Sequence, residues 1–262
     1  MAVDDHVATP PALENARIKD LPSTAYYISN FITEEEERII LSKIAAAPKP
    51  RWKQLTHRRL QTWPSELVQN RLLESPLPSW LEDPVVPRLL SLSSAGRSDL
   101  DLMPNTDSAA HTTADDVLEH VFAGSPHERP NHVLINEYPP GDGAAYWPVV
   151  CTVSLGASLC LDLHQSKEDG ALDPVPTWRI LQEPRSLLIT TDKLYTEYLH
   201  GIADIEEDMN LSEDTIVNWS LLRDRQQFAD GRNIRQTRTS LTYRDVLKVS
   251  KIGNRLSMFS TR

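Results

Sequence analysis

The sequence of 262 residues is poor in the features that mark disulfide-stabilised, secreted or membrane-spanning proteins. It has two cysteines, Cys151 and Cys160, which are too few for a disulfide scaffold or a cysteine-rich zinc site. No stretch approaches the roughly 20 apolar residues that a membrane-spanning helix needs. The first residues are polar and lack the apolar core of a signal peptide. We therefore expect no membrane partner, and a protein of the cytoplasm and nucleus.

Positive charge is also scarce. There are 27 Lys and Arg against 37 Asp and Glu, so the formal net charge is 27 − 37 = −10. This balance argues against a protein that coats nucleic acid through its overall charge, but it does not exclude a local basic patch.

The segment 48–63 is such a patch, because its cations alternate with Trp52, His57 and Trp63. The cations are Lys49, Arg51, Lys53, Arg58 and Arg59. One interpretation is a lip for nucleic acid, where cations meet phosphates and rings stack on bases. The other interpretation is a solvated hairpin whose two tryptophans pack into the core. Both interpretations stay open at this point.

The patterning predicts one domain that is mainly β with flanking helices. We expect residues 1–23 to form a flexible N-terminal arm and residues 24–262 to form the domain, with its core at about 129–250. Thr33 and Glu36 predict a capping box that opens a helix. Strands are predicted in segments rich in β-branched, aromatic and other apolar residues: 24–32, 131–138, 149–155, 159–163, 185–191 and 235–249.

Two polar segments, at about 91–127 and 204–233, are expected to be insertions in this domain. A short helix is predicted within the first of them, over residues 115–124. Several short strands separated by turns favour a sandwich or a jelly roll.

Three features of the β-rich half could carry chemistry. The first is a strand end with Asn136 and Tyr138, followed by a loop that contains Asp142. The second is His200, which precedes a glycine. The third is a strand along which Arg238, Ser240 and Arg244 occupy alternate positions. Alternate residues of a strand share a face, and arginines on a buried face are costly unless they bind anions. A carboxylate, a distant histidine and inward arginines together suggest an iron site with an acidic cosubstrate. Taken singly, each feature is better explained by a structural role, as a turn residue, a core histidine or a solvated strand face, and only their order along the chain favours a site.

The order of these residues resembles the AlkB family of non-haem iron, 2-oxoglutarate-dependent dioxygenases. The family pattern runs Asn-x-Tyr, His-x-Asp, a distal His, and then Arg with a second Arg six residues on. Longer segments are similar to one eukaryotic branch of the family, among them TAYYISNFITEEEERIIL, NHVLINEYPPG and RTSLTYR. The resemblance implies a double-stranded β-helix, which is a jelly roll. It also implies Fe(II) and 2-oxoglutarate as cofactors, and oxidative demethylation of alkylated nucleic acid as the activity.

The resemblance also implies a role for each matching residue. Tyr138 and Arg238 would hold the distal carboxylate of 2-oxoglutarate. Three further residues would help to position the cosubstrate and the metal ligands: Asn136, Ser240 and Arg244. The expected metal ligands are His200, as the distal histidine, and Asp142, as the aspartate of His-x-Asp.

One departure from the family pattern affects the metal. The loop after Tyr138 is shorter than in the family and lacks the first histidine, and neither His132 nor His164 stands at the right place. We expect iron affinity to fall by more than the roughly 10–100-fold typical of losing a supporting partner. The alternatives are a jelly-roll binding module without productive iron, and a sequence that lacks a short in-frame segment of an active parent.

Overall fold

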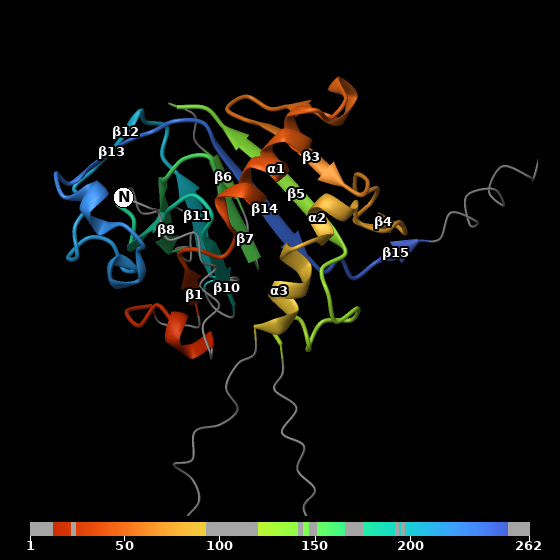
Figure 1. The fold of residues 1–262 in the computed structure, drawn as a ribbon, viewed down its shortest axis with the longest axis horizontal. Coiled ribbons are helices and arrows are strands. Elements are labelled where there is room, and N and C mark those ends of the chain that lie inside the picture. Colours follow the sequence, from red (N-terminus) through yellow and green to blue (C-terminus); the bar gives the residue numbers. More distant parts are fainter. Residues whose placement is uncertain are drawn as a thin grey trace, which may run out of the picture.

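The computed structural model describes residues 13–21, 25–92, 120–140, 144–146, 151–165, 175–191, 194 and 197–250. Two antiparallel sheets face each other at the centre of the described part (Figure 1). The larger sheet contains β1 (Ala25–Ile28), β2 (Lys53–Gln54), β3 (Arg59–Trp63), β5 (His132–Tyr138), β7 (Cys151–Leu155), β10 (Leu187–Thr190) and β14 (Arg238–Arg244). The smaller sheet contains β6 (Ala144–Tyr146), β8 (Leu159–Gln165), β9 (Trp178–Gln182) and β11 (Tyr198–Ile202).

The path of the chain between the two sheets defines the fold. The larger sheet has the strand order β1-β10-β7-β14-β5-β3-β2, and the smaller sheet has the order β6-β11-β8-β9. From β5 to β14 the chain crosses repeatedly from one sheet to the other, so most strands that are neighbours in a sheet, such as β5 and β14, are distant in sequence. This winding is a double-stranded β-helix, and it confirms the predicted jelly roll.

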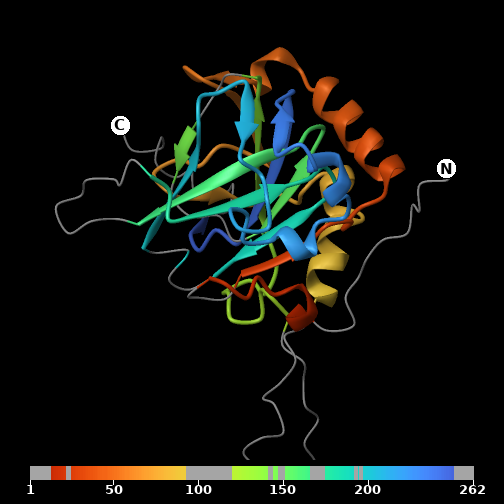
Figure 2. The same cartoon turned by 90° about the vertical axis from the view of Figure 1, so that its left-hand side faces the viewer.

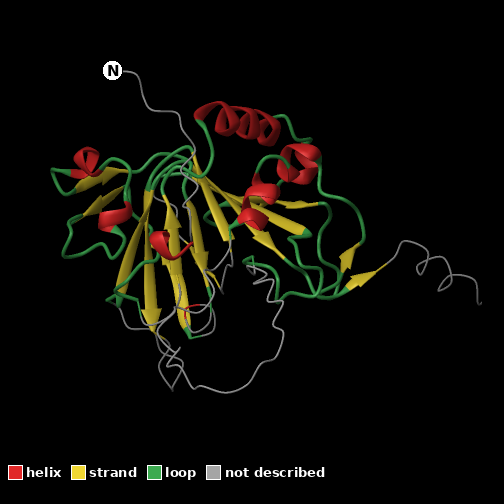
Figure 3. Ribbon diagram, turned by 60° about the horizontal axis from the view of Figure 1, so that its bottom comes forward, coloured by secondary structure: helices red, strands yellow, loops and turns green. Residues whose placement is uncertain are grey.

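Helices cover the outer face of the larger sheet (Figures 1 and 2). They are α1 (Glu34–Ala45), α2 (Ser79–Glu82) and α3 (Val85–Ser91). Buried Ile40 and Ile44 of α1 pack in one apolar cluster with Val133, Ile135 and Val153 of the sheet. Figure 3 shows the strands at the centre and the helices at the periphery.

The predicted capping box begins α1. Thr33 Oγ1 accepts a hydrogen bond from the Glu36 amide at 3.1 Å, and the Glu36 carboxylate accepts one from the Thr33 amide at 2.8 Å. Two otherwise unsatisfied amides of the first turn are thus satisfied.

A buried carboxylate ties α1 to the end of the sheets. Glu37 is 8% exposed and accepts hydrogen bonds from the Gly156 amide at 2.8 Å and from Arg185 at 3.4 Å. Gly156 has a φ of +83°, and a Cβ there would lie 2.8 Å from the Thr237 carbonyl oxygen. Only glycine fits this turn, because other residues disfavour a positive φ and the carbonyl leaves no room.

The space between the sheets holds a second apolar cluster. Tyr138 of the larger sheet packs there with Leu161, Leu163 and Ile180 of the smaller sheet. Free Cys151 and Cys160 are buried, and burial raises the pKa of both thiols, so they are inert packing residues.

The remaining elements are short. Two ribbons of two strands each are formed by β12 (Glu207–Met209) with β13 (Arg232–Ile234), and by β4 (Leu72–Leu73) with β15 (Val249–Ser250). The described residues also form four 3₁₀ turns, which are η1 (Leu13–Ala16), η2 (Lys49–Arg51), η3 (Trp219–Leu221) and η4 (Arg225–Phe228). No helix of the described residues is long and apolar enough to cross a membrane.

Several local predictions differ from the structure. Residues 13–21, assigned to a flexible arm, contain Leu13 and Ile18, which are buried in the core. Residues 120–124 form turns rather than the end of a helix, while 115–119 lie outside the described residues. The polar segment 204–233 is not merely a loop, because it folds into the β12–β13 ribbon and two 3₁₀ turns.

Candidate functional site

Adjacent strands β5 and β14 bring the predicted cosubstrate residues onto one face. Their antiparallel register places Arg238 opposite Tyr138 and Ser240 opposite Asn136. Directly opposed residues of neighbouring strands point to the same side of a sheet. That side faces the smaller sheet, because Arg238 donates a hydrogen bond to Gln182 of β9.

Arg238 and Tyr138 form the chemical centre of this face. Arg238 is 1% exposed, and its guanidinium carbon lies 5.9 Å from the centre of the Tyr138 ring. Arg58, from the basic segment, also lies 5.9 Å from that ring. The side chains of Arg238 and Tyr138 both carry hydrogen-bond donors, a guanidinium and a phenol hydroxyl, so these residues are a donor set that fits the distal carboxylate of 2-oxoglutarate.

His200 faces the same interior from the smaller sheet. It lies on β11, two residues after Tyr198 and two residues before Ile202. The side chains of Tyr198 and Ile202 belong to the apolar cluster between the sheets, and alternate residues of a strand share a face. Burial lowers the pKa of His200, so the imidazole is neutral at pH 7. Its Nε2 lies 3.1 Å from the Leu194 carbonyl oxygen, and a metal could bind Nε2 only after that hydrogen bond broke.

The described residues do not complete an iron site. Asp142 lies outside them, so the structure does not test its predicted role. In the described ranges, no group of three His, Cys, Asp or Glu side chains is arranged to hold a metal ion. A mononuclear iron site of this class needs two imidazoles and a carboxylate on one face. Of the two predicted metal ligands, the described part therefore contains His200 alone, and within that part the fit to iron is incomplete whereas the fit to a carboxylate is good.

Arg244 lies at the other end of β14, six residues from Arg238 and so about 20 Å away along the strand. It lines a cavity of about 300 Å³ together with Lys53 and His132. His132 is 1% exposed, and burial together with the Arg244 charge lowers its pKa to about 4. The structure thus groups Arg244 with His132 and Lys53 rather than with Arg238.

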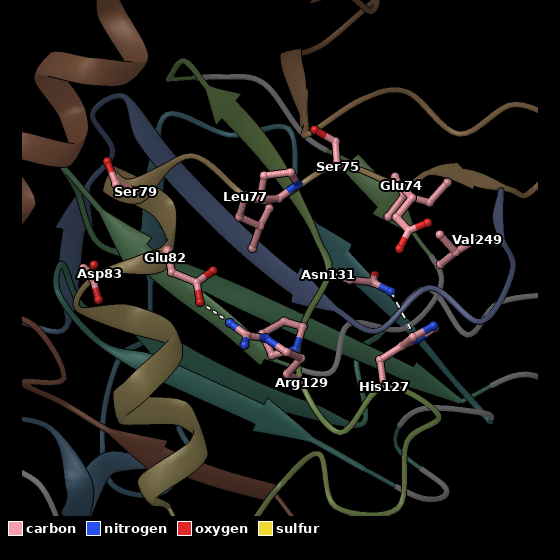
Figure 4. Close-up of a pocket in the computed structure, with 13 residues that line it drawn as sticks. Glu74, Ser75, Leu77, Ser79, Glu82, Asp83, His127, Arg129, Asn131 and Val249 are labelled. Atoms are coloured by element: carbon pink, nitrogen blue, oxygen red, sulfur yellow. Dashed lines mark hydrogen bonds and ion pairs between the residues drawn. The ribbon is translucent and has the colours of Figure 1, made fainter. Parts of the chain in front are cut away.

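A cavity of about 750 Å³ lies outside the jelly-roll interior (Figure 4). Its walls come from α2, from β4 and β15, and from the segment before β5. Arg129 pairs there with Glu82, and His127 Nδ1 lies 2.6 Å from Asp245. The lining of this cavity includes none of the predicted site residues, so the volume of the cavity alone does not make it the cosubstrate site.

The basic segment 48–63 forms a hairpin at the edge of the larger sheet, and two of its arginines are used internally. Arg51 stacks on Trp63 at 4.1 Å, and Arg59 stacks on Trp52 at 4.0 Å. Arg59 also makes a two-bond ion pair with Glu137, at 2.6 and 3.0 Å. The tryptophan rings are therefore engaged within the protein, while Lys49 and Lys53 are exposed and Arg58 is half-buried.

Sequence reasoning missed two residues of the site. Ser154 and Gln182 are buried and both contact Arg238. Ser154 lies in a strand whose residues are all buried, and Gln182 is the last residue of an edge strand. Neither residue belongs to a sequence motif, so the sequence gives no signal of their contacts with Arg238.

The chain has relatives among known proteins. The Danio rerio protein named probable RNA/DNA demethylase ALKBH6 is 34% identical over 255 residues, covering 90% of this chain and 92% of its own length. The chain belongs to the AlkB family. The predicted similarity to one eukaryotic branch of the family is thereby confirmed, and that branch is the sixth AlkB homologue. AlkB enzymes are iron- and 2-oxoglutarate-dependent oxygenases.

Other similarities to this AlkB-family chain are weaker. Uncharacterized protein L905 of Acanthamoeba polyphaga mimivirus is 28% identical over 131 residues, covering 46% of this chain and 50% of its own. The solved structure of OsALKBH1 covers 87% of this chain and 100% of its own, at 13% identity and a TM-score of 0.49. No family model matches the sequence.

Proposed function

We propose that this AlkB-family chain binds 2-oxoglutarate between its two sheets and acts as an oxygenase that demethylates alkylated nucleic acid. The observation that carries the proposal is buried Arg238, which faces the interior beside Tyr138. A buried guanidinium offers hydrogen-bond donors that suit a carboxylate, and 2-oxoglutarate supplies one.

The overall reaction is balanced by 2-oxoglutarate and O₂. One oxygen atom enters 2-oxoglutarate, which loses CO₂ and becomes succinate, and the other enters the N-methyl carbon. The resulting N-hydroxymethyl group leaves as formaldehyde. Iron, when bound, supplies the activation of O₂, with His200 and Asp142 as the proposed side-chain ligands. Because the loop lacks the first histidine of the family pattern, we propose that this chain binds iron weakly.

Anaerobic titration with Fe(II), followed by addition of O₂, 2-oxoglutarate and an N-methylated oligonucleotide, tests this activity. The expected result is succinate and formaldehyde in equal amounts, with a requirement for high iron. Absence of succinate at saturating iron would refute the oxygenase function of this chain. Reading the encoding transcript around Asp142 then shows whether a short in-frame segment containing a histidine is missing.

The second candidate is a binding module that keeps the cosubstrate pocket without the chemistry, and the missing histidine favours it. It predicts that 2-oxoglutarate raises the melting temperature without any metal. Arg238→Ala should abolish that rise, and Arg38→Ala, an exposed change on α1, should retain it. A rise that survives Arg238→Ala would refute both the module and the assigned carboxylate site.

The proposed macromolecular partner is nucleic acid, approached through Lys49, Lys53 and Arg58 at the edge of the larger sheet. Arg58 links this edge to the interior, because it lies 5.9 Å from the Tyr138 ring. We place this activity in the cytoplasm and nucleus, which fluorescence imaging of a tagged chain would test.

A further inference from the structure

Arg238 is held by two neutral oxygens that come from different sheets. Its Nη2 donates to Ser154 Oγ at 2.8 Å and to Gln182 Oε1 at 2.9 Å. Ser154 Oγ in turn donates to the same Gln182 oxygen at 3.0 Å. The three residues are 1%, 0% and 1% exposed, so this closed triangle lies entirely in the interior.

The topology explains how the triangle forms. Ser154 lies on β7, the neighbour of β14 in the larger sheet, and opposite Ser240 in the register. Gln182 ends β9 of the smaller sheet, opposite Leu159, whose side chain packs between the sheets. Gln182 therefore reaches across the interior to the arginine.

Such an anchor has two physical effects on a ligand. A long side chain that is already fixed loses less conformational freedom when it binds, so a carboxylate gains affinity from the anchoring. Neutral oxygens also fix the guanidinium without cancelling its charge, whereas a carboxylate at the same place would form an ion pair with it.

We propose that Gln182 and Ser154 are positioning residues that orient Arg238 toward the distal carboxylate of 2-oxoglutarate. Gln182, as a neutral acceptor, thereby sets the preference of the site for a dicarboxylate over a 2-oxo monocarboxylate. The inference rests on the proposed function, because it requires Arg238 to receive 2-oxoglutarate.

The competing explanation is that Gln182 only joins the two sheets. In that case its replacement would lower the stability of the fold but leave the preference between ligands unchanged. The ratio of two dissociation constants separates the explanations, because a purely structural defect affects both ligands alike.

The experiment is metal-free calorimetric titration of the full chain with 2-oxoglutarate and with 2-oxopentanoate, which carries a methyl group in place of the distal carboxylate. The variants are Gln182→Glu, Gln182→Met and Ser154→Ala. Gln61→Met is the matched control, because Gln61 is a fully buried glutamine of β3 that bonds to Ile44 and Trp63 on the opposite face of the sheet.

In the wild-type chain, 2-oxoglutarate is expected to bind at least about tenfold more tightly than 2-oxopentanoate. Gln182→Glu should bring this ratio close to one, since its carboxylate competes for Arg238. Gln182→Met and Ser154→Ala should lower the ratio by about threefold or more. Gln61→Met should leave it unchanged even if its melting temperature falls.

Each outcome has a definite meaning. If the wild type prefers 2-oxoglutarate and every folded variant keeps the same ratio, the positioning roles are refuted while the proposed function stands. If the wild type shows no preference, the assignment of Arg238 fails, and the proposed function and this inference fail with it. Ser154→Ala removes only a hydroxyl, so it tests the anchor even if the Gln182 variants do not fold.

Discussion

The stability of this protein should fall steeply with acid because of one buried histidine. His132 is 1% exposed on β5, and burial and the nearby Arg244 charge lower its pKa from 6.5 to about 4. The folded protein therefore keeps His132 neutral at pH values where the unfolded chain binds a proton. The perturbation is His132→Asn, which removes this proton uptake.

The magnitude follows from proton linkage. Between pH 6.5 and pH 4 the unfolded state binds more protons at this site, so the free energy of unfolding decreases as the pH falls. The stability associated with neutral His132 is complete above pH 6.5 and is lost on acidification down to the folded-state pKa. The full slope is about 1.4 kcal/mol per pH unit and is smaller close to either pKa, so lowering the pH from 6.5 to 4.5 should cost about 2 kcal/mol at this site.

The assay is urea unfolding of the wild type and the variant at intervals from pH 7.5 to pH 4.5. The wild-type curve should fall more steeply than that of His132→Asn, and subtracting the curves removes contributions common to both, including that of His200. His57→Asn, a change in the exposed turn between β2 and β3, should follow the wild type. Parallel curves for the wild type and His132→Asn would refute the reasoning, whatever their separation at pH 7.5.

Three further predictions concern other parts of the molecule. Thr33→Ala should lower the free energy of unfolding by about 1 kcal/mol in urea, because the first turn of α1 loses its cap. Asp208→Asn should cost about 3–5 kcal/mol in the same assay, because Arg235 keeps its charge in a buried site where Asp208 is 0% exposed; a loss below 1 kcal/mol would contradict this. The double variant Lys53→Ala, Arg58→Ala should flatten the dependence of log affinity on log salt for an oligonucleotide by about 1.5, and an unchanged slope would remove this edge from the nucleic-acid interface.

The strands and the first helix could be predicted from the sequence because their signals are local. The capping box at Thr33 is a local pattern, and it forms as predicted. The helices α2 and α3 were missed, since prolines interrupt a stretch whose apolar residues are buried only in the assembled core. The β12–β13 ribbon was missed because its central pair is Asp208 with Asn233, and Asp208 is held by Arg235 just after β13, whereas charged and polar residues usually indicate a solvated loop.

The site could be predicted only in part for a related reason. The spacing of Arg238 and Ser240 shows that they share a face, but it does not give the register with β5. Pairing of β14 with β5 depends on residues about 100 positions apart, and the contact with Gln182 also requires both sheets to be in place. Such contacts are properties of the assembled fold rather than of a segment.

The attachment of α1 through Glu37 has a consequence for the order of folding. Its partners Gly156 and Arg185 lie 119 and 148 residues later in the chain, so the helix can form early through its cap but cannot dock completely until both turns exist. Long-range contacts of this kind slow folding. During synthesis, α1 would leave the ribosome well before the turns that hold it, so its apolar side would remain uncovered until the strands that it packs against had been made.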